Sequence, residues 1–170
     1  MELSLMPPEA PATSLLTARD ARQAALVRQW GQGQRATIFF SLNVPGSDKS
    51  PAGAQALFDG VLRELNESFA GIVRLAQACD AFGPYAIMAV DVDPVTAKTR
   101  CIGLEMQSPA ARLVDLDVYS PTGVQIDRGR LGFPPRRCFV CKHAAAECIR
   151  AERHRREEVI AKAHALLTHF

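Results

Sequence analysis

The 170-residue sequence contains no apolar run that approaches the roughly 20 residues needed to span a bilayer. Its N-terminus carries Glu2, Pro7 and Pro8 where a signal peptide would need a basic region followed by an apolar run. Twenty basic and eighteen acidic residues leave a net charge of only +2, so the chain lacks the general positive field typical of proteins that bind nucleic acids or membranes. We therefore expect a cytoplasmic protein whose partner is neither a membrane nor a nucleic acid.

Internal repeats and low-complexity linkers are also absent, and 48% of the residues are hydrophobic, a composition that fits one globular domain with its own core. We expect an irregular N-terminal tail over residues 1–12 and a single domain over residues 13–170. Within that domain, residues 134–154 are rich in cysteine and arginine, and residues 150–170 are predicted to form a basic C-terminal helix. The alternation of helical and strand signals predicts the α+β class, with a mixed central sheet flanked by helices.

The spacing of apolar residues gives the individual elements. Helical spacing predicts a helix over 13–30, one or two helices over 52–79, a short helical turn over 94–98 and a basic helix from Glu147 onward. Apolar runs of strand length predict strands over 36–44, 85–92, 100–106 and 112–119. Cys79 then falls in a helix and Cys101 in a strand, and we expect both in the core.

Two carboxylates lie two residues apart in the last predicted strand. Because side chains in a strand alternate between faces, Asp115 and Asp117 share one face. A pair of carboxylates on one face can hold Mg²⁺, which prefers hard oxygen ligands and leaves positions for water and phosphate oxygens. The alternative is that the two aspartates form the solvated face of an edge strand.

Three cations stand in positions suited to phosphate. Lys49 follows a strand in the turn Pro45-Gly46-x-x-Lys49, where a lysine and loop amides could meet a polyphosphate or the lysine could simply be solvated. Arg136 and Arg137 follow two prolines that stiffen the backbone, and guanidinium groups suit bidentate phosphate binding. A solvated arginine pair remains the alternative.

The thiols form the pattern Cys138-x2-Cys141-x6-Cys148-x5-His154. Three thiolates and one imidazole satisfy tetrahedral zinc, and the spacing of the first two cysteines is that of a zinc knuckle. His143 is a rival for the fourth ligand position. In a reducing cytosol disulfides are not expected, so the alternative is a set of buried free thiols.

In combination these segments resemble the family of apo-citrate lyase phosphoribosyl-dephospho-CoA transferases, also called holo-citrate-lyase acyl-carrier-protein synthases. The resemblance rests on Pro45-Gly46-x-x-Lys49, Gly83-Pro84, Arg112-Leu113-x-Asp115-x-Asp117-Val118 and Pro134-Pro135-Arg136-Arg137-Cys138-x-x-Cys141-x6-Cys148, in this order. It extends from about Leu15 to Leu167. The aspartate segment and the Pro-Pro-Arg-Arg-Cys segment are its most specific parts.

The resemblance implies a nucleotidyltransferase-like enzyme. Such an enzyme moves phosphoribosyl-dephospho-CoA from 2′-(5″-triphosphoribosyl)-3′-dephospho-CoA to a serine of the apo acyl carrier (γ) subunit of citrate lyase and releases pyrophosphate. Asp115 and Asp117 would then be catalytic and hold Mg²⁺. The triphosphate would be bound by the cations Lys49, Arg112, Arg136 and Arg137.

The chain departs from the family pattern at one point, where Ser108-Pro109-Ala110-Ala111 stands in place of His-Pro-x-Gly. This departure keeps open a related transfer to the carrier protein of malonate decarboxylase. A hypothesis of another class is a non-enzymatic binding module stabilised by zinc, whose basic segment docks an acidic partner. These two hypotheses differ in whether function depends on Asp115 and Asp117.

Overall fold

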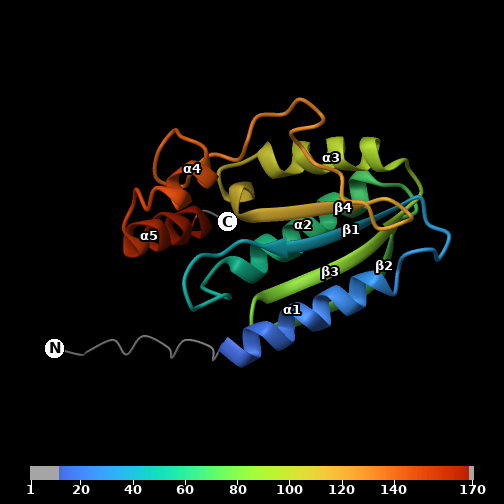
Figure 1. The fold of residues 1–170 in the computed structure, drawn as a ribbon, viewed down its shortest axis with the longest axis horizontal. Coiled ribbons are helices and arrows are strands. Elements are labelled where there is room, and N and C mark those ends of the chain that lie inside the picture. The colour runs from blue at the N-terminus through green and yellow to red at the C-terminus, as the bar shows by residue number, and fades with distance from the viewer. Residues whose placement is uncertain (1–11, 169–170) are drawn as a thin grey trace.

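The computed structural model describes residues 12–168, so the tail expected over residues 1–12 lies outside the described residues except for Ala12. Along the chain the elements are α1 (Ala12–Val27), β1 (Ala36–Leu42), α2 (Ala54–Ser68), β2 (Val73–Asp80), β3 (Gly83–Val90), α3 (Pro94–Met106), the short 3₁₀ helix η1 (Ala110–Leu113), β4 (Val114–Tyr119), α4 (Ala145–Arg150) and α5 (Arg156–Leu167) (Figure 1). No helix within this described part is long and apolar enough to cross a bilayer.

The four strands form one sheet in the order β2-β3-β1-β4, and every neighbouring pair is antiparallel. The α+β class and the single domain with a central sheet flanked by helices are confirmed. The sheet is not mixed, however. β3 and β4 do run in the same direction, as a helical crossover requires, but β1 lies between them and no parallel pair forms.

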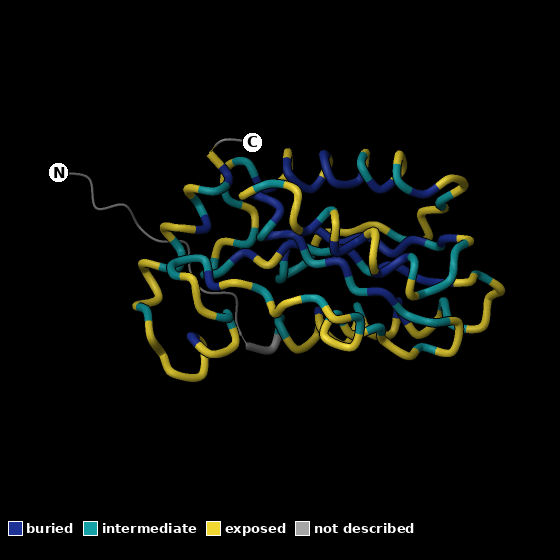
Figure 2. The backbone as a smooth tube through the Cα atoms, turned by 90° about the horizontal axis from the view of Figure 1, so that it is seen from above, coloured by how far each residue is buried: buried dark blue, intermediate teal, exposed yellow. Residues whose placement is uncertain are grey.

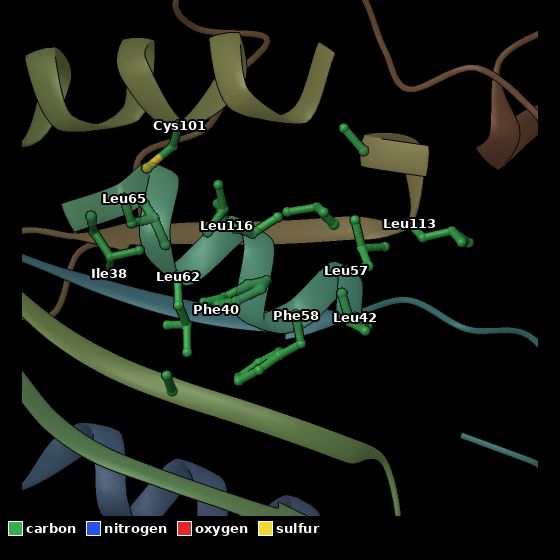
Figure 3. Close-up of a cluster of buried hydrophobic side chains, with 14 of the residues drawn as sticks. Ile38, Phe40, Leu42, Leu57, Phe58, Leu62, Leu65, Cys101, Leu113 and Leu116 are labelled. Atoms are coloured by element: carbon green, nitrogen blue, oxygen red, sulfur yellow. The ribbon is translucent and has the colours of Figure 1, made fainter. Parts of the chain in front are cut away.

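The main core lies on the face of the sheet that α2 and α3 cover (Figure 3). Alternate residues of β1, such as Ile38 and Phe40, point to this face and are fully buried. Phe40 stacks on Phe58 of α2 with ring centroids 4.4 Å apart. Figure 2 shows the buried residues concentrated in the strands and on the inner sides of the helices.

Helix α1 covers part of the opposite face, where Leu26 packs near Ile87 of β3 (Figure 1). Arg22 fixes this helix to the sheet. Its guanidinium donates two hydrogen bonds to the Asp80 carboxylate, at 2.7 and 2.6 Å, and one to the carbonyl of Gly83 at 2.8 Å. It also lies over the ring of Tyr85, 4.6 Å from the centroid.

The outer edge of β4 has no neighbouring strand along Val114 and Leu116, and side chains bond the backbone groups there. At its end the N–H of Ile126 donates to the carbonyl of Val118 at 2.8 Å. Lys98 Nζ donates to the carbonyl of Leu116 at 2.7 Å, and the N–H of Leu116 donates to Glu105 Oε1 at 2.8 Å. Further along, Arg136 Nη1 donates to the carbonyl of Val114 at 2.9 Å. Lys98 and Glu105 both come from α3, so this helix covers the core and closes the edge of the sheet.

The expected strand over 100–106 is wrong, because these residues belong to α3. Asp93 caps this helix by accepting the N–H of Thr96 at 2.9 Å, and Pro94 occupies its first turn. Ala97 and Cys101 are buried four residues apart on its inner face. The helical spacing expected to stop at residue 98 therefore continues to Met106.

Two further expectations differ from the structure. The helical stretch over 52–79 ends at Ser68, and β2 follows as an edge strand with both faces largely exposed, so that Cys79 is exposed and not in the core. Cys101 is buried as expected, although in a helix. The basic C-terminal segment forms two helices, α4 and α5, because the chain turns between residues 151 and 155, where Glu152 has a positive φ of 44°.

We predict that the anchor of α1 contributes to stability in a pH-dependent way. Burial raises the pKa of Asp80, but bonds from Arg22 and the Phe82 N–H outweigh this effect and hold the pKa below its ordinary value of 3.8. The contribution is therefore present above pH 3.8 and is lost as the pH falls below it. Asp80→Asn should lower the free energy of unfolding by about 2 kcal/mol at pH 7.

Urea unfolding at pH 7 and at pH 3 measures this effect, and the difference between Asp80→Asn and the unmodified protein should shrink at the lower pH. Asp20→Asn is the control, because Asp20 is largely exposed beside Arg19 on the same helix. A deficit that is equal at both pH values would contradict the assignment to the charged pair.

Candidate functional site

The aspartate pair lies on the face of β4 that points away from the main core. Asp115 stands opposite Ser41 and Asp117 opposite Phe39 on β1. The alternate residues Val114, Leu116 and Val118 are buried. Asp115 keeps 40% of its side chain exposed. The alternation of the strand thus brings two carboxylates to one face next to solvent.

The pair is electrostatically strained. Burial, followed by the charge of Asp115, raises the pKa of Asp117 to about 6. One hydrogen bond, from Gln125 Nε2 to Asp117 Oδ1 at 2.8 Å, partly compensates. A cation bound between the two carboxylates would favour the charged form of Asp117, so the pair is suited to a cation.

Arg136 connects this pair to the edge of the sheet. Its Nη2 donates to Asp115 Oδ1 at 3.0 Å and to Glu105 Oε1 at 2.7 Å, while its Nη1 is held by the carbonyl of Val114. With three oxygen acceptors, its guanidinium is fixed in position beside Asp115. Arg136 is therefore a stationary positive charge at the end of the carboxylate pair.

Arg112 and Arg137 lie close by but differ in their contacts. Arg112, on η1, donates to the carbonyl of Cys138 and lies over the ring of Phe139, 5.6 Å from its centroid. Arg137 is exposed, and no protein partner for its guanidinium is found within residues 12–168. Arg137 can therefore bind an external anion without giving up an internal bond.

Lys49 lies apart from these arginines. Its Nζ donates to the carbonyl of Val44 at 2.7 Å, within its own loop. Burial, and then the charge of Arg156, lower the pKa of Lys49. The sequence grouped Lys49 with Arg112, Arg136 and Arg137, but Lys49 lines neither of the two pockets that these three arginines share.

The three thiols and one imidazole of the predicted zinc site do converge. The ligand atoms of Cys138, Cys141, Cys148 and His154 all lie within 4.8 Å of one another. Cys141 Sγ is 3.4 Å from Cys148 Sγ and 3.3 Å from His154 Nε2. Ligands of tetrahedral zinc are separated by roughly 3.5–3.8 Å, so this cluster fits a structural zinc ion.

The backbone around the first two cysteines supports that assignment. The N–H of Cys138 donates to the carbonyl of His143 at 2.9 Å, and Arg137 pairs with Ala144 in an antiparallel bridge, which closes a tight turn. His143, the rival ligand, is exposed and contacts Arg153, and its Nδ1 lies 3.5 Å from Cys141 Sγ, whereas His154 lies within 4.8 Å of all three thiols. The structure thus favours His154 as the fourth ligand.

Two pockets meet at the arginines. The first, of about 540 Å³, lies beside α3 and includes Glu105 and Arg128 in its lining. The second, of about 570 Å³, lies beside the thiol cluster. Arg112, Arg136 and Arg137 line both, so the three arginines form a wall between the two pockets.

Glu105 was missed in the sequence. It is buried, accepts bonds from Arg136 and from the Leu116 N–H, and lies 3.9 Å from Arg128. A signal was available, because Lys98 and Glu105 are seven residues apart and share one face of a helix. Since residues 100–106 were read as a strand, this pattern was not recognised.

Comparison with known proteins finds a family and individual relatives that carry the same description. The profile of the family described as apo-citrate lyase phosphoribosyl-dephospho-CoA transferase matches residues 11–170. Proteins with that name from Citrobacter koseri, Escherichia coli O7:K1 and Shigella boydii serotype 18 are each 29% identical over 157 residues. The aligned part covers 90% of this chain and 86% of each relative.

The raised pKa of Asp117 predicts a stability change of unusual sign. The folded value of about 6 lies above the ordinary value of 3.8, so the native state binds more protons between these two values. The free energy of unfolding should therefore fall as the pH rises from about 4 through about 6. Asp117→Asn removes this loss and should stabilise the metal-free protein at pH 7.5 by on the order of 1–3 kcal/mol.

Urea unfolding in the presence of a chelator measures this gain across the pH range. Asp20→Asn, on the surface of α1, should leave the pH profile unchanged. If Asp117→Asn shows the same decline between pH 4 and pH 6 as the unmodified protein, another group titrates there.

The thiol cluster predicts a bound metal with local structural effects. The purified protein should hold zinc, and exchange with Co²⁺ should give the thiolate charge-transfer absorption of a tetrahedral site. Cys148→Ser should lose the metal and lower the hydrogen-exchange protection of residues 136–155, because all four candidate ligands lie in that segment. Cys79→Ser, at an exposed thiol on β2, is the matched control. Full protection of residues 136–155 in a metal-free protein would overturn this role.

Proposed function

Because the chain belongs to the family of apo-citrate lyase phosphoribosyl-dephospho-CoA transferases, we propose that it transfers this prosthetic group to the acyl carrier subunit of citrate lyase. The donor is 2′-(5″-triphosphoribosyl)-3′-dephospho-CoA and the acceptor is a serine hydroxyl of the apo subunit. In this nucleotidyltransferase-type displacement, the serine oxygen forms a bond to the phosphorus nearest the ribose. The bond from that phosphorus to the next phosphate breaks, and pyrophosphate leaves.

The observation that carries this proposal is the carboxylate pair beside a wall of arginines. The displacement develops charge on the leaving pyrophosphate, so catalysis depends mainly on positioning and electrostatic stabilisation. Arg137 and Arg112, which line both pockets, would bind the outer phosphates, and Arg136 bonds Asp115. Lys49 would join the triphosphate only if it exchanged its bond to Val44 for a phosphate oxygen.

Asp115 and Asp117 are the residues that would hold Mg²⁺. Their hard oxygen atoms and the raised pKa of Asp117 fit a divalent cation. When bound, Mg²⁺ supplies charge neutralisation at the reacting phosphate. One carboxylate of this pair would also accept the serine proton.

The zinc-binding turn has a supporting role in this proposal. Cys138 directly follows Arg136 and Arg137, so a metal at the cluster fixes the backbone that presents both arginines. The thiolates must stay reduced to bind zinc, which agrees with a cytoplasmic enzyme. The basic segment around α4 and α5 would help to attract an acidic carrier subunit.

Ser108, which replaces the histidine of the family pattern, has a local structural role. Its Oγ accepts the N–H of Ala111 at 3.1 Å at the start of η1, and it lines the first pocket. A hydroxyl there cannot exchange a proton as an imidazole does near neutral pH. The carrier of malonate decarboxylase is therefore tested beside that of citrate lyase.

Mass spectrometry of the carrier subunit tests the reaction directly. The apo carrier, incubated with this protein, Mg²⁺ and the triphosphoribosyl donor, should gain the mass of the prosthetic group. Asp115→Asn and Asp117→Asn should each lower kcat by about a hundredfold or more, because each removes one ligand of the cation. Asp20→Asn is the control.

Three results would count against the proposal. Transfer without added Mg²⁺ in a chelator would contradict the metal role. Transfer to the malonate decarboxylase carrier alone would change the acceptor. No mass gain with either carrier, from a folded protein that retains zinc, would favour a non-enzymatic binding module.

A further inference from the structure

The pocket beside the thiol cluster has a charged wall and a set of apolar lining residues. Arg112, Arg136 and Arg137 form the charged wall. The apolar residues include Phe139, whose ring lies beside the Arg112 guanidinium, Ile149 on α4 and Val159 on α5. The volume of about 570 Å³ is that of a typical site for a nucleotide-sized ligand.

The charged wall leads toward the aspartate pair. Arg136 lines the pocket and also donates to Asp115 Oδ1 at 3.0 Å. A phosphate bound at these arginines therefore lies near the carboxylates, and whatever extends from that phosphate can enter the pocket.

The apolar lining residues suit an uncharged, partly aromatic portion of a ligand. Phe139 is half-buried, and Ile149 at the rim is 75% exposed, which is unusual for a large apolar side chain. Asn43, Glu152, His154 and Arg156 add polar groups among the apolar ones. This combination of apolar surface and sparse polar groups is typical of pockets that bind cofactor-like molecules.

The geometry points to a binding site for the dephospho-CoA part of the donor in this pocket, with its phosphates at the arginine wall and its body against Phe139, Ile149 and Val159. This assignment rests on the proposed transfer, in which the reacting phosphorus lies between the leaving pyrophosphate and the dephospho-CoA part. It adds the residues that select the donor by its non-reacting portion. Binding energy from such a portion positions the reacting phosphate.

The site also depends on the metal cluster. Cys138, Cys148 and His154 are among the lining residues, so one side of the pocket is the zinc-binding turn itself. Loss of zinc should therefore weaken binding of the donor while the sheet that carries Asp115 and Asp117 remains folded. This coupling gives the assignment a second readout.

Dephospho-CoA itself is the probe, because it lacks the triphosphate and cannot react. Titrated into the ¹⁵N-labelled, zinc-containing protein, it should shift the amide signals of Phe139, Ile149 and Val159, and leave those of β2 unchanged. Inorganic pyrophosphate is the control ligand and should shift only the signals of the arginine wall. Signals at Ile149 and Val159 that do not respond to dephospho-CoA would overturn the site.

Ile149→Glu tests the same site through kinetics. Because Ile149 is largely exposed, the change should not unfold the protein, and a negative charge at the rim should weaken dephospho-CoA binding and raise the KM for the donor by roughly tenfold. The KM for the donor should change more than kcat, and Ile149→Leu should keep the KM of the unmodified protein. Leu16→Glu, at an exposed apolar residue of α1, is the matched control.

The outcomes separate this site from the reaction. A rise in the KM for the carrier with no change for the donor would make Ile149 a carrier contact and overturn the assignment. If dephospho-CoA shifts the pocket signals but no carrier is modified, the binding site stands and the proposed transfer fails. If transfer occurs and dephospho-CoA shifts other regions, the transfer stands and the site is wrong.

Discussion

The unpaired edge of β4 is the constraint from which the rest of the site follows. A strand without a neighbour leaves backbone N–H and C=O groups that must be bonded elsewhere when they are buried. Here Lys98, Glu105 and Arg136 supply those bonds. Because the same Arg136 guanidinium bonds Asp115, the closure of the sheet also positions a charge at the carboxylate pair. Arg136 therefore belongs both to the closed edge of the sheet and to the candidate site.

The segment after β4 could not hold that arginine in place by packing alone. Between Tyr119 and α5 the chain has one short helix and mostly exposed residues, so it contributes little to the main core. The convergence of Cys138, Cys141, Cys148 and His154 offers a metal ion in place of a local core. This arrangement explains why two features far apart in chemistry, soft thiolates and phosphate-binding arginines, adjoin in the sequence.

Features set by local periodicity could be predicted from the sequence, and features set by tertiary position could not. The shared face of Asp115 and Asp117 follows from strand alternation, and the convergence of Cys138, Cys141, Cys148 and His154 was one of the arrangements that their spacing allowed. By contrast, β2 is an exposed edge strand whose apolar residues mimic helical spacing. The predicted helical turn ended at residue 98, whereas α3 continues to Met106. Glu105 was therefore not recognised as a residue on the same helix face as Lys98. Sequence order also does not reveal that the Lys49 ammonium donates to the carbonyl of Val44 within its own loop.

Arg136 and Arg137 are adjacent in sequence and yet serve different purposes, and their backbone explains why. Arg137 lies in an extended bridge, where neighbouring side chains point to opposite sides. Arg136 therefore reaches the sheet edge and is bonded by three oxygen atoms, while Arg137 remains exposed. Arg136 is therefore committed to internal bonds beside Asp115, whereas Arg137 is free to bind an external anion. Asp117, whose pKa burial and the charge of Asp115 raise to about 6, accepts a hydrogen bond from Gln125, and a proton or a bound cation would neutralise its charge.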